Sequence, residues 1–542
     1  MGTSLTSLPA GTETPKDVIT CRVLINDAVL NNEAELAQIT VNKTFNKIAA
    51  AKLVFHDGSG SERDFVLSND GKFKPGNKIT IQMGYHGEAE TIFKGIIIRH
   101  GIKIGHAGRS VLMIEAKDEA IRLTGARKSV PHIRKTDKAV ITMLAGALAG
   151  TIDDMPFEHE QLVQYESTDW DFIVIRAEAN GMLVLTDDGK LTVKKPSLSP
   201  ATVTATFGEN IYEFEADMDA RRQSKKITGL SWDYKTQKTN EPKESQVLFR
   251  ETGNIPAADI GKVIGAEVTL LHSGNLTQKQ VEKWVDAYAL RNQLSKAIGR
   301  VRIAGDAKLK PGMTIKLVGV GDHFNGNVFV SGVLHQYDGA WYTDIQFGWK
   351  EEWFYQKEKV MERPATGLLP GVNGLQIGKV QDIKDDGQYR IKVYVATTGE
   401  KSPAGIWARI ATLDAGKDHG VVFRPQVDDE VVLGFLNDDP RDAIILGYLH
   451  SKDKQTSPLP PSEKKVEYGI VTKFKQRLVF DDTNKKITIS TDDGKKMIVL
   501  NDSDSILMKD DKGNSFKMDS NGITIESKGT VTIKGETLVQ IN

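Results

Sequence analysis

A few short stretches of the 542-residue sequence contain residue types that could catalyse a reaction or bind a metal. His159-Glu160 begins like the zinc-binding motif of metalloproteases, but that motif needs a second histidine where Val163 stands. The glycine-rich residues 319–323 lack the lysine and the serine or threonine of a phosphate-binding loop. We therefore interpret His159-Glu160 as surface polar residues and residues 319–323 as a hairpin loop.

Two acidic stretches have the composition of calcium-binding loops. Residues 492–494 read Asp-Asp-Gly and residues 510–513 read Asp-Asp-Lys-Gly, but neither has the ligand spacing or the terminal glutamate of such a loop. The eleven histidines do not cluster, and a single cysteine, Cys21, can form neither a disulfide framework nor a cysteine metal cluster. We predict turns at the acidic stretches, no cofactor or metal site, and no enzyme activity.

The composition is that of a folded, turn-rich protein with several domains. Lysine and arginine number 71 against 72 aspartates and glutamates, so no general electrostatic attraction to nucleic acid or anionic membranes is expected. No apolar run approaches the roughly 18 residues of a membrane span. Because residues 1–16 lack a positive region and an apolar region, we expect a protein made in the cytoplasm without a signal peptide.

The last part of the chain has a short apolar repeat. Pairs of apolar residues separated by one polar residue return every eight positions, and they are Ile523 and Ile525, Val531 and Ile533, and Val539 and Ile541. Lys528-Gly529 and Lys534-Gly535 between them are turn formers. A repeat this short is typical of a β-helix, and one chain cannot cover such strands. Residues 468–542 are therefore predicted to form a needle shared by several chains, with an ordinary sheet-edge domain as the alternative.

The part of the chain before residue 366 is predicted to contain two β-barrels. After an N-terminal arm of residues 1–17, residues 18–125 are strand-rich, and residues 126–236 contain helices. Residues 237–365 contain strands and a helix at 278–298, which begins with Thr277 and Gln280 at capping-box spacing and is expected to end at Gly299. Lysine, proline and glycine precede a strand both at residues 74–76 and at residues 310–312, which suggests two related barrels.

A compact β unit and a linker follow. The unit spans residues 372–452, with strands expected at 375–382, 388–395, 406–410, 420–423, 429–435 and 442–448. Six short strands in about eighty residues suit a small barrel of the OB kind. Residues 453–467 are proline-rich and are predicted to form an extended linker before the needle.

Several motifs resemble those of VgrG, the trimeric spike of type VI secretion, and of the baseplate hub and spike of contractile phage tails and extracellular injection particles. The matching stretches are residues 164–172 and 177–181, residues 309–312 followed by residues 324–326, His335 and residues 341–343, and, in the OB unit, residues 378–380, 390–393, 407–409, 424–431 and 440–447. The resemblance implies a mainly β fold with minor α, with two hub barrels and a helical insert, an OB-fold, and a C-terminal intertwined triple-stranded β-helix in a homotrimer.

The resemblance also implies a function. The protein would be the central spike of a contractile injection machine, joining the sixfold inner tube and baseplate proteins to a threefold, membrane-piercing needle. The core of the needle would be Ile523, Ile525, Val531, Ile533, Val539 and Ile541. Its tip, Val539, Gln540, Ile541 and Asn542, would contact a PAAR-type cap protein.

The resemblance further implies the setting in which the protein acts. The protein is expected in an assembled particle, released from the cell or delivered by contraction, with transient contact to a target membrane and no nucleic acid partner. Type VI secretion, a phage tail, a tailocin and an extracellular injection particle all fit, and neither a lysozyme domain nor an effector domain after the needle is expected. The alternative function is a fibre or adhesin whose OB unit binds a glycan or an oligonucleotide.

Overall fold

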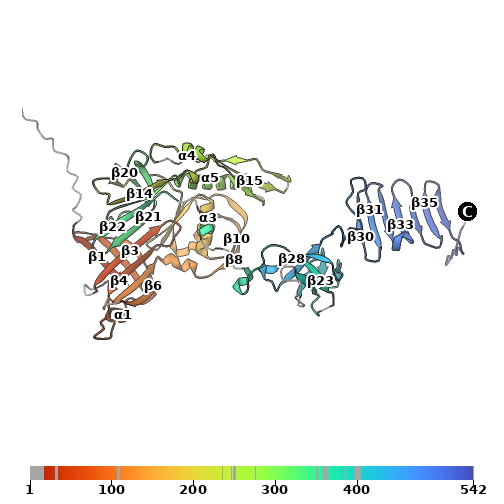
Figure 1. Cartoon of the computed structure of the whole chain (residues 1–542), viewed down its shortest axis with the longest axis horizontal. Helices are drawn as coiled ribbons and strands as arrows, with labels where there is room; N and C mark the ends of the chain where they lie inside the picture. The colour runs from red at the N-terminus through yellow and green to blue at the C-terminus, as the bar shows by residue number, and fades with distance from the viewer. Residues whose placement is uncertain are drawn as a thin grey trace, which may run out of the picture. The chain divides into compact units, whose positions relative to one another are not determined.

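The computed structural model divides the chain into two compact units, residues 1–362 and residues 363–542 (Figure 1). Strands make up most of the regular structure in both units, as the sequence predicts. The structure describes residues 17–540, apart from residues 31–33, 106–109, 235, 246, 248, 250–251, 275, 350–351, 358–359, 361–363, 385 and 396–404.

A 13-stranded sheet is the framework of the first unit. Its strand order is β14-β19-β22-β21-β3-β4-β7-β6-β5-β1-β2, with β20 beside β21 and β13 beside β20. The strands are β1 (Ile19–Ile25), β2 (Ala28–Val29), β3 (Leu36–Thr44), β4 (Ala50–His56), β5 (Lys78–Tyr85), β6 (Glu88–Ile104), β7 (Ser110–Lys117), β13 (Val203–Thr206), β14 (Glu213–Met218), β19 (Ala297–Ala304), β20 (Thr314–Val318), β21 (Gly326–Tyr337) and β22 (Trp341–Phe347).

The strands predicted for two barrels meet within this one sheet. β3 and β21 pair antiparallel, with Thr44 opposite Gly332 and Ile39 opposite Tyr337. Each half still has its own apolar core, one around Leu53 and the other around Ile345. The sequence predicts the two halves but not their junction, because β3 and β21 are far apart in the chain and periodicity reports only local structure.

Two helices form the centre of the region between the halves. α2 (Asp137–Ala145) and α3 (Asp169–Ala179) contact each other, and the side chains of Thr136 and Thr168 cap their N-termini. Around them lie a two-stranded sheet and a three-stranded sheet. The strands of the first are β8 (Lys128–Thr136) and β10 (Glu158–Ser167), and those of the second are β9 (Ala149–Ile152), β11 (Leu183–Asp187) and β12 (Lys190–Lys194).

A smaller sheet carries the long helix α5 (Gln278–Leu294). Its strands are β15 (Lys226–Asp233), β16 (Lys238–Thr239), β17 (Lys243–Glu244) and β18 (Glu267–His272), and the short helices of the unit are α1 (Val66–Asn69), α4 (Ala257–Ile264) and α6 (Phe354–Lys357). The predicted capping box of Thr277 and Gln280 is confirmed. Gly229 lets α5 lie close to β15, because a Cβ there would come within 2.3 Å of Val285.

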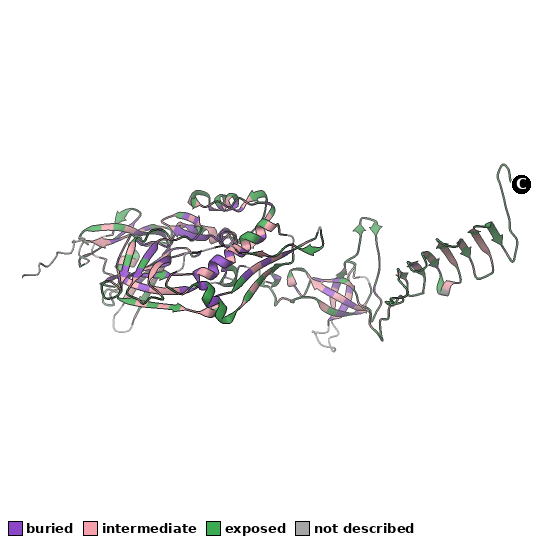
Figure 2. Ribbon diagram, turned by 90° about the horizontal axis from the view of Figure 1, so that it is seen from above, coloured by how far each residue is buried: buried purple, intermediate pink, exposed green. Residues whose placement is uncertain are grey.

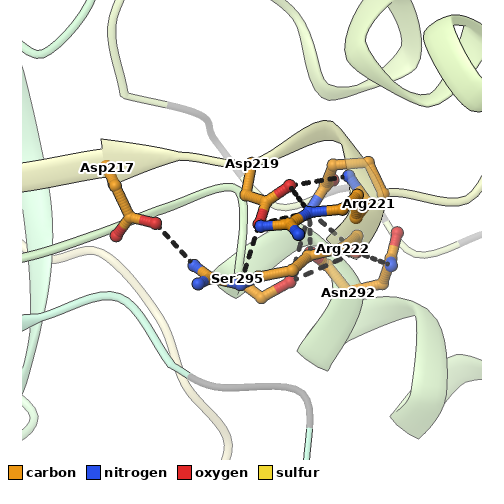
Figure 3. Close-up of polar contacts among 7 residues, drawn as sticks. Asp217, Asp219, Arg221, Arg222, Asn292 and Ser295 are labelled. Carbon is orange, nitrogen blue, oxygen red and sulfur yellow. Dashed lines mark hydrogen bonds and ion pairs between the residues drawn. The ribbon is translucent and has the colours of Figure 1, made fainter.

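The predicted end of α5 is wrong. The helix ends at Leu294, and Gly299 lies within β19. Polar contacts close the helix without a glycine: the side-chain amide of Asn292 donates to the carbonyl of Arg222 at 2.6 Å, and the Ser295 hydroxyl donates to the carbonyl of Asn292 at 2.8 Å (Figure 3). The Arg222 guanidinium also reaches Asp217, the next-to-last residue of β14, at 3.0 Å (Figure 3).

The second unit contains a closed five-stranded barrel with the order β23-β24-β25-β29-β28. Its strands are β23 (Gln376–Asp382), β24 (Ile391–Val395), β25 (Ile406–Ile410), β28 (Glu430–Phe435) and β29 (Ala443–Tyr448). Val380, Val393, Val431 and Ile445 fill its core. The barrel is thus confirmed, but the strand predicted at residues 420–423 is not, because only β26 (Ala415–Gly416) and β27 (His419–Gly420) pair there.

The C-terminal part of this unit is a seven-stranded antiparallel sheet in which every strand pairs with its neighbours along the chain. The strands are β30 (Glu467–Val471), β31 (Arg477–Asp481), β32 (Lys486–Ser490), β33 (Met497–Asn501), β34 (Ile506–Lys509), β35 (Ser515–Asp519) and β36 (Gly522–Glu526). Figure 2 shows that these strands consist almost entirely of exposed and intermediate residues, unlike the barrel strands. The winding of three chains remains a prediction.

Candidate functional site: the apolar face of the C-terminal sheet

Large apolar side chains form two rows on one face of the C-terminal sheet. The strands pair so that apolar residues stand directly opposite one another, two from each strand and two residues apart. Residues two apart in a strand point to the same side. One row is Tyr468, Phe480, Ile487, Leu500, Ile506, Met518 and Ile523, and the other is Ile470, Leu478, Ile489, Ile498, Met508, Phe516 and Ile525. We call this surface the two-row face.

Within the described residues of the second unit, the two-row face is left largely uncovered. Eleven of its fourteen side chains are exposed, from 36% at Ile487 to 65% at Ile523, although side chains of this size are usually buried. Leu478, Ile498 and Phe516 are partly buried. Along the second row lies an open groove of about 860 Å³, whose lining includes Ile489, Met508 and Phe516. A continuous apolar surface of this kind marks an interaction site.

On the opposite face of the sheet, an apolar middle row is flanked by charged side chains. Its middle row contains Val479, Val499 and Leu507, and Val479 is buried. Charged residues flank this row, and some of them pair, as do Lys486 with Asp481 and Lys517 with Asp519. Long charged side chains cover apolar neighbours with their aliphatic stems. This face is therefore suited to water, and the two-row face to a partner.

Ile523 and Ile525 lie in the two rows, whereas Val531, Ile533 and Val539 do not. Val531, Ile533 and Val539 are exposed and lie in residues 527–540, which form no strand. They follow the last hydrogen-bonded strand, and a strand added to the margin of an uncovered sheet gains little packing. Of the predicted tip residues, Gln540 is exposed, and Ile541 and Asn542 lie outside the described residues.

The repeat of eight residues contains only two of the fourteen members of the two rows, Ile523 and Ile525. The signal is present, since pairs of apolar residues separated by one residue occur in every strand from β30 onward. The loops between strands differ in length, so the pairs do not return at a fixed interval. A search for pairs in alternation, instead of a fixed repeat, would have found them.

His159, a candidate metal ligand by its position in the sequence, forms contacts within the folded protein. His159 is buried and contacts the carboxylate of Asp137 at 3.0 Å, and Asp137 also accepts from Arg176 at 2.6 Å. The pKa of Asp137 is lowered despite its burial, because His159, Arg176 and Asn180 hydrogen-bond to the carboxylate. His159 is therefore not the surface residue that the sequence predicted.

The two acidic stretches form turns, and the carboxylate of Asp510 is hydrogen-bonded within its own turn. Asp510 accepts hydrogen bonds from the backbone of Lys512 and Asn514 at 2.8 and 2.9 Å, which lowers its pKa and is the geometry of a turn. Residues 492–494 form a single helical turn. Within the described part of the chain, no three histidine, cysteine, aspartate or glutamate side chains gather in a way that could hold a metal ion.

The barrel of the second unit identifies the class of protein. Residues 376–450 match the family model of the type VI secretion system/phage-baseplate injector OB domain. The predicted relationship to VgrG and to contractile-tail baseplate hub and spike proteins is thereby confirmed. The chain is a baseplate or spike component of a contractile injection system.

The first unit gives the family. Residues 15–338, more than half of the chain, match the model of the Alg8 N-terminal domain. The chain therefore belongs to the Alg8 N-terminal domain family. No curated protein matches the sequence. In the described residues, no helix is long and apolar enough to cross a membrane.

Solved structures of tail and secretion proteins are similar to this chain. A 43 kDa tail protein of prophage MuSo2 from Shewanella oneidensis has 12% identity and a TM-score of 0.46, covering 61% of this chain and 99% of its own. An E. coli component of the type VI secretion system has 13% identity and a TM-score of 0.38, covering 79% and 99%. VgrG in the Francisella PdpA-VgrG complex has 10% identity and a TM-score of 0.38, covering 94% and 80%.

Proposed function

We propose that this protein is the trimeric central spike of a contractile injection machine. Three chains pack the two-row faces of their C-terminal sheets around a common axis, and the resulting rod is the piercing needle. The observation that carries the proposal is the two-row face itself, with large apolar side chains from every strand left uncovered.

Packing of the two-row faces supplies the stability that a needle requires. Burying one large aliphatic side chain completely contributes about 1.5 to 3 kcal/mol. These side chains are about half buried already, so each gains a fraction of that value, but every strand contributes two of them. The charged outer face then remains in water. Two copies could also cover the two-row faces, as a sandwich of two sheets. The choice of three copies therefore comes from the resemblance to VgrG.

The first unit supports the role of the hub. Its sheet contains two strand-rich halves with separate cores, so three chains would present six similar units. Such a ring would match a threefold needle to a hexameric inner tube. Baseplate proteins, a PAAR-type tip protein and, transiently, a target membrane are the other partners, within a particle that acts outside the producing cell or by contraction. The protein acts mechanically and not as an enzyme.

A pull-down tests this function. Purified full-length chain is mixed with the inner tube protein and with the PAAR-type protein from the same gene cluster, and retention of both is expected. The alternative of a fibre or adhesin predicts a different outcome, in which neither protein is retained and the chain binds a glycan array. That outcome would overturn the proposal.

A further inference from the structure

The C-terminal sheet ends on an open edge. Within the described chain β36 pairs only with β35, so its other side presents unpaired backbone N–H and C=O groups. Open edges of this kind invite pairing with another strand. The next residues, 527–540, form no strand, although they contain the exposed apolar side chains of Val531 and Ile533.

Hairpin loops of ordinary length define a register in which these residues would extend both rows. A three-residue loop of Ser527, Lys528 and Gly529 places Val531 opposite Ile525 and Ile533 opposite Ile523. Three-residue hairpin loops with glycine at the last, left-handed position are common. A five-residue loop at residues 534–538 then places Val539 opposite Ile533, and residues 510–514 already form a loop of this length between β34 and β35.

The contacts of Ser527 and Val531 agree with the first hairpin of this register, the one that directly follows β36. The Ser527 hydroxyl donates to the side-chain oxygen of Asn514 at 2.9 Å, which holds the chain beside the loop that precedes β35. Val531 lines the same groove as Ile525 and Phe516. Val531 thus already borders the second row, although no ladder continues beyond β36.

We propose that residues 530–533 and 539–540 become two further strands on the open edge of β36, in this register, when three chains assemble. The inference rests on the proposed function, because the added strands are stabilised only when their apolar side chains are buried in the core of the trimer. Ordering each residue costs backbone conformational entropy. In one chain the added side chains would stay in water, whereas in the trimer they are buried with the rest of both rows. The segment therefore folds as it binds.

Engineered disulfides test the register. In a Cys21→Ser background, Thr524→Cys with Thr532→Cys joins two positions that the register places directly opposite, on the face away from the two rows. Opposite residues of antiparallel strands have Cα atoms about 4.5 to 5.5 Å apart, which is within disulfide range. The matched control, Thr524→Cys with Gln540→Cys, is separated by one intervening strand. Mild oxidation should link the first pair within one chain and leave the control reduced.

The dependence on assembly is tested by adding Met508→Asp, which places a charge on the two-row face. Intrachain linkage of residues 524 and 532 should then slow at least tenfold, and backbone amides of residues 530–533 should lose their protection from hydrogen exchange. Equal linkage of both pairs, or an interchain bond, in a trimeric protein would overturn the register and leave the spike proposal standing. Equal linkage rates with and without Met508→Asp would overturn the assembly dependence. A wild-type monomer would instead overturn the proposed function.

Discussion

The carboxylate of Glu178 on α3 lies 2.7 Å from the guanidinium of Arg291 on α5, and both side chains are almost completely buried. Glu178 also accepts hydrogen bonds from the side chain of Asn46 at 2.6 Å and from the backbone of Phe354 at 2.8 Å. Arg291 lies over the ring of Trp353 at 4.4 Å. The pair therefore connects several segments that are distant in the sequence.

Removing one member of this pair should strongly destabilise the first unit. Arg291→Met leaves the Glu178 carboxylate buried without its cation, which typically costs about 3 to 5 kcal/mol. The double variant Arg291→Met with Glu178→Gln removes both charges and should recover a large part of that loss. Urea denaturation monitored by tryptophan fluorescence measures both variants. If the single variant unfolded at the same urea concentration as the wild type, the pair would not stabilise the first unit.

Acid should destabilise the first unit through His335. This imidazole is buried and bonded to the hydroxyl of Thr343 at 3.0 Å, and desolvation lowers its pKa from 6.5 to about 3. The unfolded state therefore binds more protons than the folded state between these values, so His335 contributes stability above pH 6.5 that is lost as the pH falls toward 3. The maximum slope is about 1.4 kcal/mol per pH unit.

The variant His335→Gln isolates this contribution. Its unfolding free energy should be lower than that of the wild type at pH 7, and it should fall less steeply between pH 6.5 and pH 4.5. Denaturant titrations at several pH values in this window give both slopes. Parallel slopes for the two proteins would show that His335 does not account for the acid sensitivity. Asp137, whose pKa is lowered, adds its own loss of stability only below its ordinary pKa near 4.

The N-cap of α5 gives a smaller and more local prediction. The Thr277 hydroxyl accepts from the backbone of Gln280, and the Gln280 side chain accepts from the backbone of Thr277 at 2.8 Å. Thr277→Ala should destabilise the unit by about 1 kcal/mol, and Thr277→Ser by less. Thermal unfolding of the three proteins would show this order, and an equal effect of alanine and serine would argue against the cap.

Local patterns in the sequence predict much of this protein, and long-range pairings limit the rest. Apolar alternation predicts the OB strand at residues 406–410, and the spacing of Thr277 and Gln280 predicts the cap of α5. Both are present in the structure. The junction of β3 with β21 depends on residues far apart in the chain, so no local pattern contains it. His159 looked exposed for the same reason, because its partners Asp137 and Arg176 come from other elements.

The predicted needle core and the two-row face share only two residues in the described part of the chain. Ile523 and Ile525 belong to the two-row face, but the rows begin at Tyr468, because unequal loops such as residues 482–485 and residues 510–514 hide the repeat. The fixed spacing of eight selected residues after β36, where the ladder has ended. Strand register, which a one-dimensional period does not report, decides which side chains share a face.

Sedimentation equilibrium of the full-length protein measures whether the two-row face joins three chains. Met508 and Lys509 are neighbours in β34 with side chains on opposite faces, so Met508→Asp and Lys509→Asp form a matched pair. At micromolar concentration the wild type and Lys509→Asp should have three times the 59.7 kDa mass of one chain, and Met508→Asp should dissociate. A wild-type mass of 59.7 kDa, or an unchanged trimer in Met508→Asp, would show that the two-row face does not join three chains.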